Sequence, residues 1–196
     1  MSINISTMPL FDHFDLIAPL YDRLIRLPEG DILAEMAGLP VTGLLLDAGG
    51  GTGRVAQRLV DRSGHVVVAD SSVKMLRQAL SKDGLHVVGS EIERLPFCCG
   101  CFERVVIVDA FHHLGNQDRS LTELWRVLMP GGRLVIEEPD IRCFPVKLVA
   151  LAEKLTLFRS HFVPAEQIAN HLDTFGARTI VRREGHTVWV IGDKPL

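Results

Sequence analysis

The stretch that decides the fold is residues 44–59, LLLDAGGGTGRVAQRL. Leu44, Leu45 and Leu46 form a short apolar run, which is typical of a strand buried on both faces of a parallel sheet. Asp47 ends this run, and four of the next six residues are glycines. Apolar residues then recur at helical spacing. The sequence therefore predicts a strand, a glycine loop and a helix, in that order.

The glycine loop predicts a ligand site, because glycines adopt positive φ and let a ligand lie against the main chain. The predicted helix would add unpaired N–H groups and a partial positive charge. A dinucleotide fingerprint G-x-G-x-x-G fails from Gly49, because its third position is Arg54, and passes from Gly51 only in the relaxed form that accepts Ala56. The pattern D-x-G-x-G-x-G fits at all of its specified positions, with Asp47, Gly49, Gly51 and Gly53.

This pattern resembles motif I of the class I S-adenosylmethionine-dependent methyltransferases. Three further segments resemble the small-molecule type of that family, which includes enzymes of ubiquinone and menaquinone biosynthesis (UbiE-like, methyltransferase type 11). They read FDHFDLIAPLYDRLIRL, SEIERLPFCCGCFERVVIVD and LTELWRVLMPGGRLVIEEPD, so the resemblance covers about residues 11–140. It implies an α/β, Rossmann-like fold with a seven-stranded, mostly parallel sheet, an antiparallel C-terminal strand and helices on both faces.

The resemblance also implies a single methyltransferase domain, residues 1–196. Its expected parts are an N-terminal helical cap (1–40), a cofactor-binding core (41–140), variable substrate-lid helices (141–176) and a closing hairpin (177–196). In the family the leader covers the cofactor pocket, and Tyr21 is the matching aromatic residue. The alternative is that Tyr21 is only the contact between an amphipathic helix and the sheet.

Asp70 is the expected ribose ligand, because it ends a second buried strand 17 residues after Gly53. Related folds hold a ribose hydroxyl at an offset of about 20 residues. A carboxylate accepts two hydroxyl donors at once, so one residue can bind both ribose hydroxyls. Ser71 and Ser72 can cap the following helix, and a mere capping role for Asp70 is the alternative.

Glu91 stands where the family usually has an aspartate for the adenine amino group, and Ile92 replaces a small residue. Glu91 keeps the acceptor but is one methylene longer. A fourth strand, Arg104 to Asp109, ends beside the ligand crevice, because ligands of open α/β sheets bind at the carboxyl ends of the strands. The predicted site for S-adenosyl-L-methionine consists of Asp47, Gly49, Gly51, Gly53, Asp70, Ser71, Glu91, Ile92, Asp109 and Tyr21.

His112 and His113 follow this strand and match an L-H-H-L ending found in the family. A base is needed only if the methyl acceptor arrives protonated, as a hydroxyl or an acidic carbon does. His112 is the first candidate, since an unperturbed histidine has a pKa near ~6.5. His113 is the second, and a structural histidine pair is the third reading, because adjacent side chains point in different directions.

The acceptor is expected to be a small, hydrophobic or aromatic molecule that is methylated on oxygen or carbon. The Asn/Asp-Pro-Pro-aromatic signature of enzymes that methylate amide or nucleobase nitrogens is missing from the sequence. A net charge of −3 without a run of more than two Lys or Arg disfavours nucleic acid as a partner. No apolar run has the length of a membrane span, and no signal peptide is recognisable. We therefore expect a cytoplasmic monomer or homodimer.

Cys98, Cys99 and Cys101 crowd into four positions, which is no disulfide framework. The C-x-x-C they contain could bind a soft metal or carry out thiol chemistry. No second cysteine pair completes a zinc tetrahedron, and the histidines lack metal-ligand spacing, so no metal is predicted. The preferred reading is that Cys98 fills apolar space beside the adenine edge.

Two other functions stay open on the sequence. The first is a protein that binds S-adenosylmethionine without catalysis and uses the same pocket to sense or assist a partner. The second is a nicotinamide-dependent reductase. It would need a hydride-transfer set such as Tyr-x-x-x-Lys, whereas the only tyrosine, Tyr21, has Ile25 four residues later.

Overall fold

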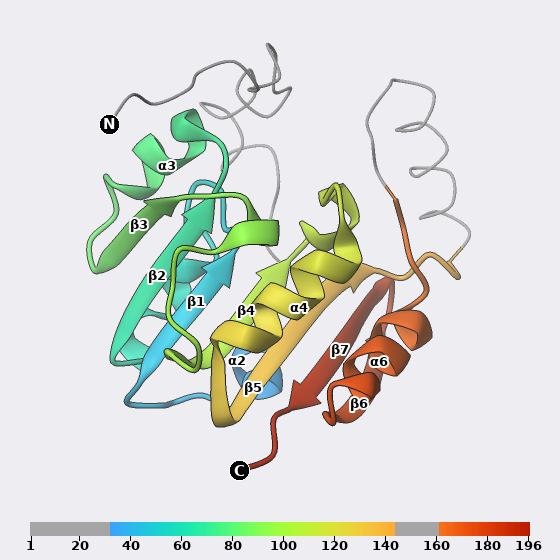
Figure 1. Ribbon diagram of the computed structural model, residues 1–196. Helices are drawn as coiled ribbons and strands as arrows, with labels where there is room; N and C mark the ends of the chain where they lie inside the picture. Colours follow the sequence, from blue (N-terminus) through green and yellow to red (C-terminus); the bar gives the residue numbers. More distant parts are fainter. Residues whose placement is uncertain (1–31, 144–160) are drawn as a thin grey trace.

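The computed structural model describes residues 32–143 and 161–196, which form one sheet with helices on both faces (Figure 1). The strands are β1 (Leu44–Ala48), β2 (His65–Asp70), β3 (Leu85–Gly89), β4 (Phe102–Val108), β5 (Leu128–Pro139), β6 (Arg178–Glu184) and β7 (Thr187–Asp193). The α-helices are α2 (Ile32–Met36), α3 (Val73–Ala79), α4 (Gln117–Val127) and α6 (Ala165–Thr174). The 3₁₀ helices are η1 (Ala56–Arg58), η2 (Val60–Arg62), η3 (Ile92–Arg94) and η4 (Phe111–His113). None of the helices in these ranges is long and apolar enough to cross a bilayer.

The seven strands lie in the order β3-β2-β1-β4-β5-β7-β6. The pairs from β3 to β5 are parallel, while β7 is antiparallel to both β5 and β6. A single strand, β7, therefore runs against the others. The predicted α/β class, with a mostly parallel sheet and an antiparallel C-terminal strand, is confirmed.

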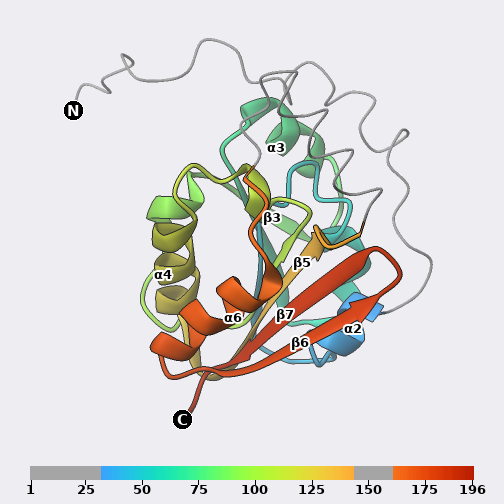
Figure 2. The ribbon, with the colours of Figure 1, turned by 90° about the vertical axis from the view of Figure 1, so that its right-hand side faces the viewer.

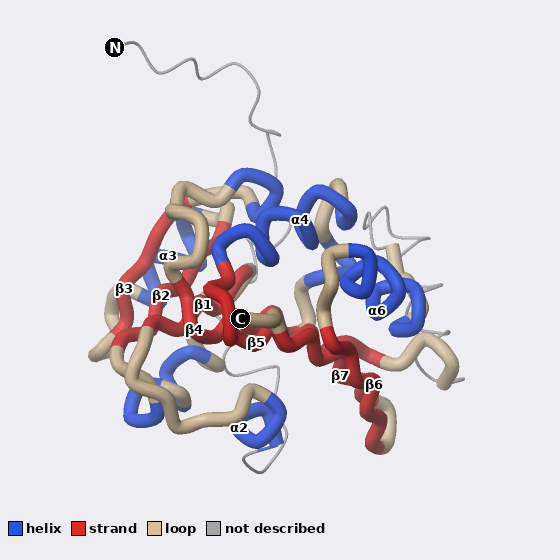
Figure 3. Tube along the Cα trace, turned by 60° about the horizontal axis from the view of Figure 1, so that its bottom comes forward, coloured by secondary structure: helices blue, strands red, loops and turns tan. Residues whose placement is uncertain are grey.

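Successive side chains of β1 are buried on opposite faces of the sheet. Leu46 belongs to the apolar cluster that contains residues of α4 and α6, and Leu45 belongs to the cluster that contains residues of α2, η1 and α3. Figure 3 shows the sheet between α4 and α6 on one side and α2 on the other. Because both faces are covered, the carboxyl edge of the parallel strands is where polar side chains can gather around a ligand.

Helix α6 lies against the β6–β7 hairpin (Figure 2). Ile168 and Leu172 of this helix are buried in the same cluster as α4. The helix starts directly after Pro164, as predicted. It falls in the range 141–176 that the sequence assigns to the substrate lid, yet it packs as part of the core. The predicted helix 144–158 and the predicted leader helices with Tyr21 lie outside the described residues.

The prediction of an α-helix directly after the glycine loop is wrong. The chain instead forms the two three-residue 3₁₀ helices η1 and η2. Their hydrogen bonds connect residues three apart, from the Arg58 N–H to the Val55 carbonyl and from the Leu59 N–H to the Ala56 carbonyl. The Ala56 N–H is directed to the Asp47 carboxylate. Helices this short supply no sustained dipole, so the expected positive helix end is absent from this loop.

Candidate active site

The glycine loop is held in its conformation by Asp70. Gly49, Gly51 and Gly53 have φ of 69°, 55° and 73°, a region in which residues other than glycine are strained. The Gly51 N–H donates to Asp70 Oδ2 at 2.9 Å, and the Ser72 N–H donates to Asp70 Oδ1 at 2.8 Å. One carboxylate thus joins the loop after β1 to the end of β2.

Gly51 and Gly53 face different surroundings. Among the described atoms, a Cβ atom built on Gly51 has Asp70 Oδ2 and Met75 Sδ as its near neighbours, at 3.9 and 4.0 Å. A Cβ atom on Gly53 would lie 2.7 Å from Leu85 Cδ1. Gly53 is therefore closely packed, whereas within the described part of the chain the space above Gly51 is open beside the Asp70 carboxylate.

We expect Gly51→Val to abolish cofactor binding while the far-ultraviolet circular dichroism spectrum is largely kept. The valine side chain would fill the open space, and its backbone would be strained at this φ by more than about 1–2 kcal/mol. Gly185→Val is the matched control, since Gly185 has φ of 58° and a Cβ there meets nothing within 4 Å. Calorimetric titration with S-adenosylhomocysteine should separate the two variants. Normal binding by Gly51→Val would mean that this loop is not the cradle.

Asp47 is a buried carboxyl with one oxygen that has no partner among the described residues. Asp47 is 1% exposed, and no described group donates a hydrogen bond to its Oδ2. Burial raises the pKa of Asp47 to about 7; the Ala56 N–H lowers it and the nearby Asp70 carboxylate raises it further. A buried oxygen without a donor is costly. A bound ligand that brings a donor, such as an ammonium group, would satisfy it.

The raised pKa of Asp47 predicts a pH-dependent stability for the cofactor-free protein. Between the ordinary value near 3.8 and about 7, the carboxyl is protonated in the folded state but ionised in the unfolded state. Stability should therefore fall as pH rises through this window, by at most about 1.4 kcal/mol per pH unit, and then level off.

Urea unfolding of the wild type and of Asp47→Asn from pH 4.5 to 8 measures this contribution. Asparagine does not titrate, so the difference in stability between the two proteins should change across the window and stay constant above pH 7. A difference that is independent of pH would contradict the buried, proton-binding state of Asp47.

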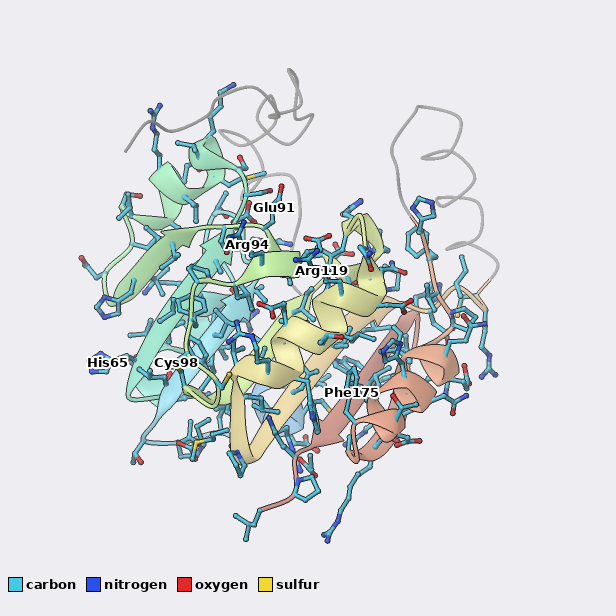
Figure 4. The ribbon with its side chains drawn as sticks, in the orientation of Figure 1. His65, Glu91, Arg94, Cys98, Arg119 and Phe175 are labelled. Carbon is cyan, nitrogen blue, oxygen red and sulfur yellow. A yellow bond between two sulfur atoms is a disulfide. The ribbon has the colours of Figure 1, made fainter. Side chains whose placement is uncertain are left out.

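The other predicted cofactor residues lie around the same edge of the sheet. Ser71 is exposed directly after β2, and Ser72 rather than Ser71 caps α3, with its Oγ accepting from the Met75 N–H at 3.2 Å. Glu91 is exposed just before η3, and Ile92 is buried at its start. Figure 4 shows Glu91 beside η3, well away from Cys98. Tyr21 lies outside the described residues.

Carboxyl groups gather at the ends of four neighbouring strands; they belong to Asp47, Asp70, Asp109, Glu137 and Glu138. Asp109 is the only non-glycine residue with positive φ among the described residues, at 53°. Such a conformation is uncommon and concentrates at functional sites. Burial raises the pKa of Glu137, and the neighbouring Asp109 and Glu138 carboxylates raise it further against a hydrogen bond from Trp189. The edge therefore favours a ligand that carries positive charge.

His112 and Glu138 form a buried pair at the carboxyl ends of β4 and β5. His112 Nδ1 lies 2.5 Å from Glu138 Oε2, and the two residues are 3% and 7% exposed. The other oxygen, Oε1, accepts the Phe111 N–H at 2.8 Å, so Glu138 holds both the turn and the ring. In the tautomer that carries its proton on Nδ1, His112 donates to the Glu138 carboxyl group, and Nε2 keeps the lone pair that can accept a proton.

His113 differs from its neighbour in its chemistry. Its ring centroid lies 3.9 Å from that of His112. Burial, and secondly the nearby His112, lower the pKa of His113 to about 4. A group with this pKa is neutral near pH 7 and accepts protons poorly, so the site favours His112 over His113 as a base.

Phe162 and His161 also contact the turn that carries His112. The Phe162 ring stacks on the His112 ring, with 4.3 Å between centroids and 14° between planes. The His161 N–H donates to the His112 carbonyl at 2.7 Å. The sequence reasoning missed Glu138 and Phe162. The acidic end of the fifth strand, Glu137-Glu138, could have indicated Glu138. No local pattern in the sequence indicates a role for Phe162.

The expectation for the cysteines is wrong in two respects. Cys98 and Cys101 are joined by a disulfide, whereas the sequence predicts no disulfide framework from their spacing. Cys98 is exposed and precedes β4, at the opposite end of that strand from Asp109, so it cannot fill space beside the adenine edge. The conformation of the loop before β4 brings the two sulfur atoms together, and the spacing of the cysteines alone does not predict this conformation. In the described part of the chain, no three His, Cys, Asp or Glu residues are grouped to hold a metal ion.

Comparisons with known proteins agree with this geometry. A family model described as a methyltransferase domain matches residues 46–136. The chain is 30% identical to the ubiquinone/menaquinone biosynthesis C-methyltransferase UbiE of Vibrio vulnificus (strain YJ016), over 83% of this chain and 68% of the relative.

Two solved structures show the same fold at lower identity. A SAM-dependent methyltransferase of Thermotoga maritima superposes with a TM-score of 0.73 and 21% identity, over 92% of this chain and 98% of that protein. The YcgJ protein of Bacillus subtilis gives a TM-score of 0.74 and 14% identity, over 84% and 97% of the two chains.

Proposed function

Because the chain belongs to the class I S-adenosylmethionine-dependent methyltransferases, in the family of the UbiE C-methyltransferases, we propose that it methylates a small hydroxyaromatic acceptor on carbon or oxygen. The observation that carries this proposal is the buried His112–Glu138 pair at the carboxyl ends of β4 and β5. Such a pair is useful where the acceptor must lose a proton.

The residues of the carboxyl edge fit S-adenosylmethionine. Asp70 would accept the ribose hydroxyls beside the two backbone N–H groups that it already holds, since each carboxylate oxygen accepts more than one donor. The open space above Gly51 would take the amino-acid part of the cofactor. Asp47 Oδ2 would accept from the ammonium group. The carboxyl groups along the edge would balance the positive sulfonium and ammonium.

When bound, S-adenosylmethionine supplies a methyl group that is already strongly electrophilic. The protein's own residues then have to orient the acceptor and move its proton. His112 Nε2 takes the proton from the acceptor hydroxyl, and Glu138 stabilises the imidazolium that results. Bringing the acceptor into line supplies further acceleration, up to ~7–11 kcal/mol in well-oriented systems.

The choice of acceptor rests on the relatives and on the base. The matched relatives are named C-methyltransferases of ubiquinone and menaquinone biosynthesis. An electron-rich ring becomes a better carbon nucleophile once its hydroxyl is ionised, which a buried histidine–carboxylate pair would promote. A cytoplasmic location, and a monomer or homodimer, remain predictions from the sequence.

Mass spectrometry of methyl transfer to 1,4-dihydroxynaphthalene tests the proposal. The protein is incubated anaerobically with this hydroquinone and with S-adenosylmethionine that carries a trideuterated methyl group. We expect the label on a ring carbon or on a hydroxyl oxygen of the product. If the protein binds the cofactor but transfers no label to this compound or to a panel of phenols, the proposal fails and a non-catalytic role gains support.

A further inference from the structure

Gln117 connects two segments that are far apart in the sequence and meet beside His112. This first residue of α4 donates from Nε2 to the Phe111 carbonyl at 3.1 Å and to the His161 carbonyl at 2.7 Å. The His161 N–H in turn donates to the His112 carbonyl at 2.7 Å. Three hydrogen bonds therefore connect His161, Gln117 and the turn η4.

The two bonds from Gln117 need the chemistry of an amide or a cation. A single nitrogen must present two N–H groups to two carbonyl oxygens, which hydroxyl and imidazole side chains cannot do. Asparagine has the group but is one methylene shorter. The half-buried position of Gln117 increases the cost of leaving either carbonyl without a donor.

The segment that Gln117 fixes carries the ring that covers His112. Phe162 follows His161 directly and stacks on the His112 imidazole. Glu138 restrains the same ring at Nδ1, so the ring is held at one edge by a carboxylate and on one face by an aromatic side chain. Loss of the Phe162 contact would remove the aromatic support from this face of the imidazole and leave its orientation to the bond with Glu138.

We infer that Gln117 is a positioning residue for methyl transfer: it fixes the segment 161–163 against η4, so that Phe162 holds the His112 ring in its reactive orientation. This inference rests on the proposed role of His112 as the base. Gln117 itself need not touch cofactor or acceptor.

Three variants test this role. Gln117→Met has a similar length and no donor, and Gln117→Lys returns several N–H donors on one nitrogen. Gln167→Met is the matched control, because Gln167 is exposed on α6 and its side chain makes no described contact.

The first measurements use the complex with S-adenosylhomocysteine and need no acceptor. We expect the His161 amide to exchange its hydrogen about tenfold faster in Gln117→Met, as the loss of about one hydrogen bond's net stabilisation predicts. The ¹⁵N signals of the His112 ring should shift as well. Gln117→Lys should recover most of the protection, and Gln167→Met should match the wild type. Unchanged exchange and unchanged ring signals in Gln117→Met would overturn the inference.

The second measurement is the single-turnover rate with 1,4-dihydroxynaphthalene at saturating cofactor. Gln117→Met should be about tenfold slower, with the dissociation constant of the cofactor within twofold of the wild type. A wild-type rate together with faster His161 exchange would show a purely structural residue and overturn the inference. If the wild type transfers no methyl group, the proposed function fails, and the ring signals of His112 still decide whether Gln117 positions it.

Discussion

Replacing His112 by alanine is expected to lower methyl transfer about 10²- to 10⁴-fold, which is the usual contribution of a positioned general base. The affinity for S-adenosylhomocysteine should stay close to that of the wild type, because His112 is not among the residues proposed to bind the cofactor. Glu138→Gln should also lower the rate, because an amide has one acceptor oxygen for the two N–H groups that the carboxylate accepts from Phe111 and His112. An amide NH₂ that faces Nδ1 would place the imidazole proton on Nε2 and remove the base. Single-turnover transfer to 1,4-dihydroxynaphthalene measures both variants.

His65→Ala is the matched control for these variants. His65 is exposed at the start of β2, far from the carboxyl edge, and Figure 4 shows it at the border of the molecule. Its removal should leave the transfer rate unchanged. If His112→Ala transferred methyl at the wild-type rate, His112 would not be the base, and catalysis would rest on proximity alone.

Replacing Asp70 by alanine is expected to weaken cofactor binding by one to two orders of magnitude or more. Hydrogen bonds to a charged group contribute about 1.5–3 kcal/mol each, and about 1.4 kcal/mol is a factor of ten in affinity. The variant loses the ribose acceptor and also the bond that holds the Gly51 N–H. Calorimetric titration with S-adenosylhomocysteine gives the affinity directly.

Asp61→Ala serves as the control for Asp70→Ala, because Asp61 is an exposed carboxylate on η2. It should bind the cofactor as the wild type does. Urea unfolding of both variants shows whether a loss of affinity follows from a loss of folded protein. Equal affinity of Asp70→Ala and the wild type would remove Asp70 from the site.

Most of the fold was predictable because its signals are local. The apolar run of Leu44 to Leu46 has the pattern of a strand buried on both faces, and glycines follow where positive φ is required. Ser72 and Pro164 precede α3 and α6 as expected. The α-helix expected after Gly53 is replaced by the 3₁₀ helices η1 and η2, a difference that the spacing of apolar residues does not reveal.

The candidate catalytic arrangement was only half predictable, because it depends on which strands are neighbours. The sequence singled out His112 at the end of a strand. Glu138 lies 26 residues later and meets His112 only because β4 and β5 pair side by side. Phe162 and Gln117 reach the same turn from two further segments. The periodicity of the sequence does not predict contacts between residues that are far apart in the chain.

The measurement that tests the central claim most directly is the pH dependence of single-turnover transfer to 1,4-dihydroxynaphthalene. It compares the wild type with His112→Ala and Asp47→Asn under anaerobic conditions between pH 5 and 8.5. Asp47→Asn is included because the pKa of Asp47, about 7, falls in this range, whereas the pKa of His113, about 4, falls below it.

If His112 is the base, the wild-type rate rises with pH as the imidazole loses its proton and then levels off. Asp47→Asn should keep this limb of the profile. His112→Ala should lose it and show a low rate that rises only as the acceptor hydroxyl ionises by itself. The same rising limb in His112→Ala as in the wild type would contradict the account.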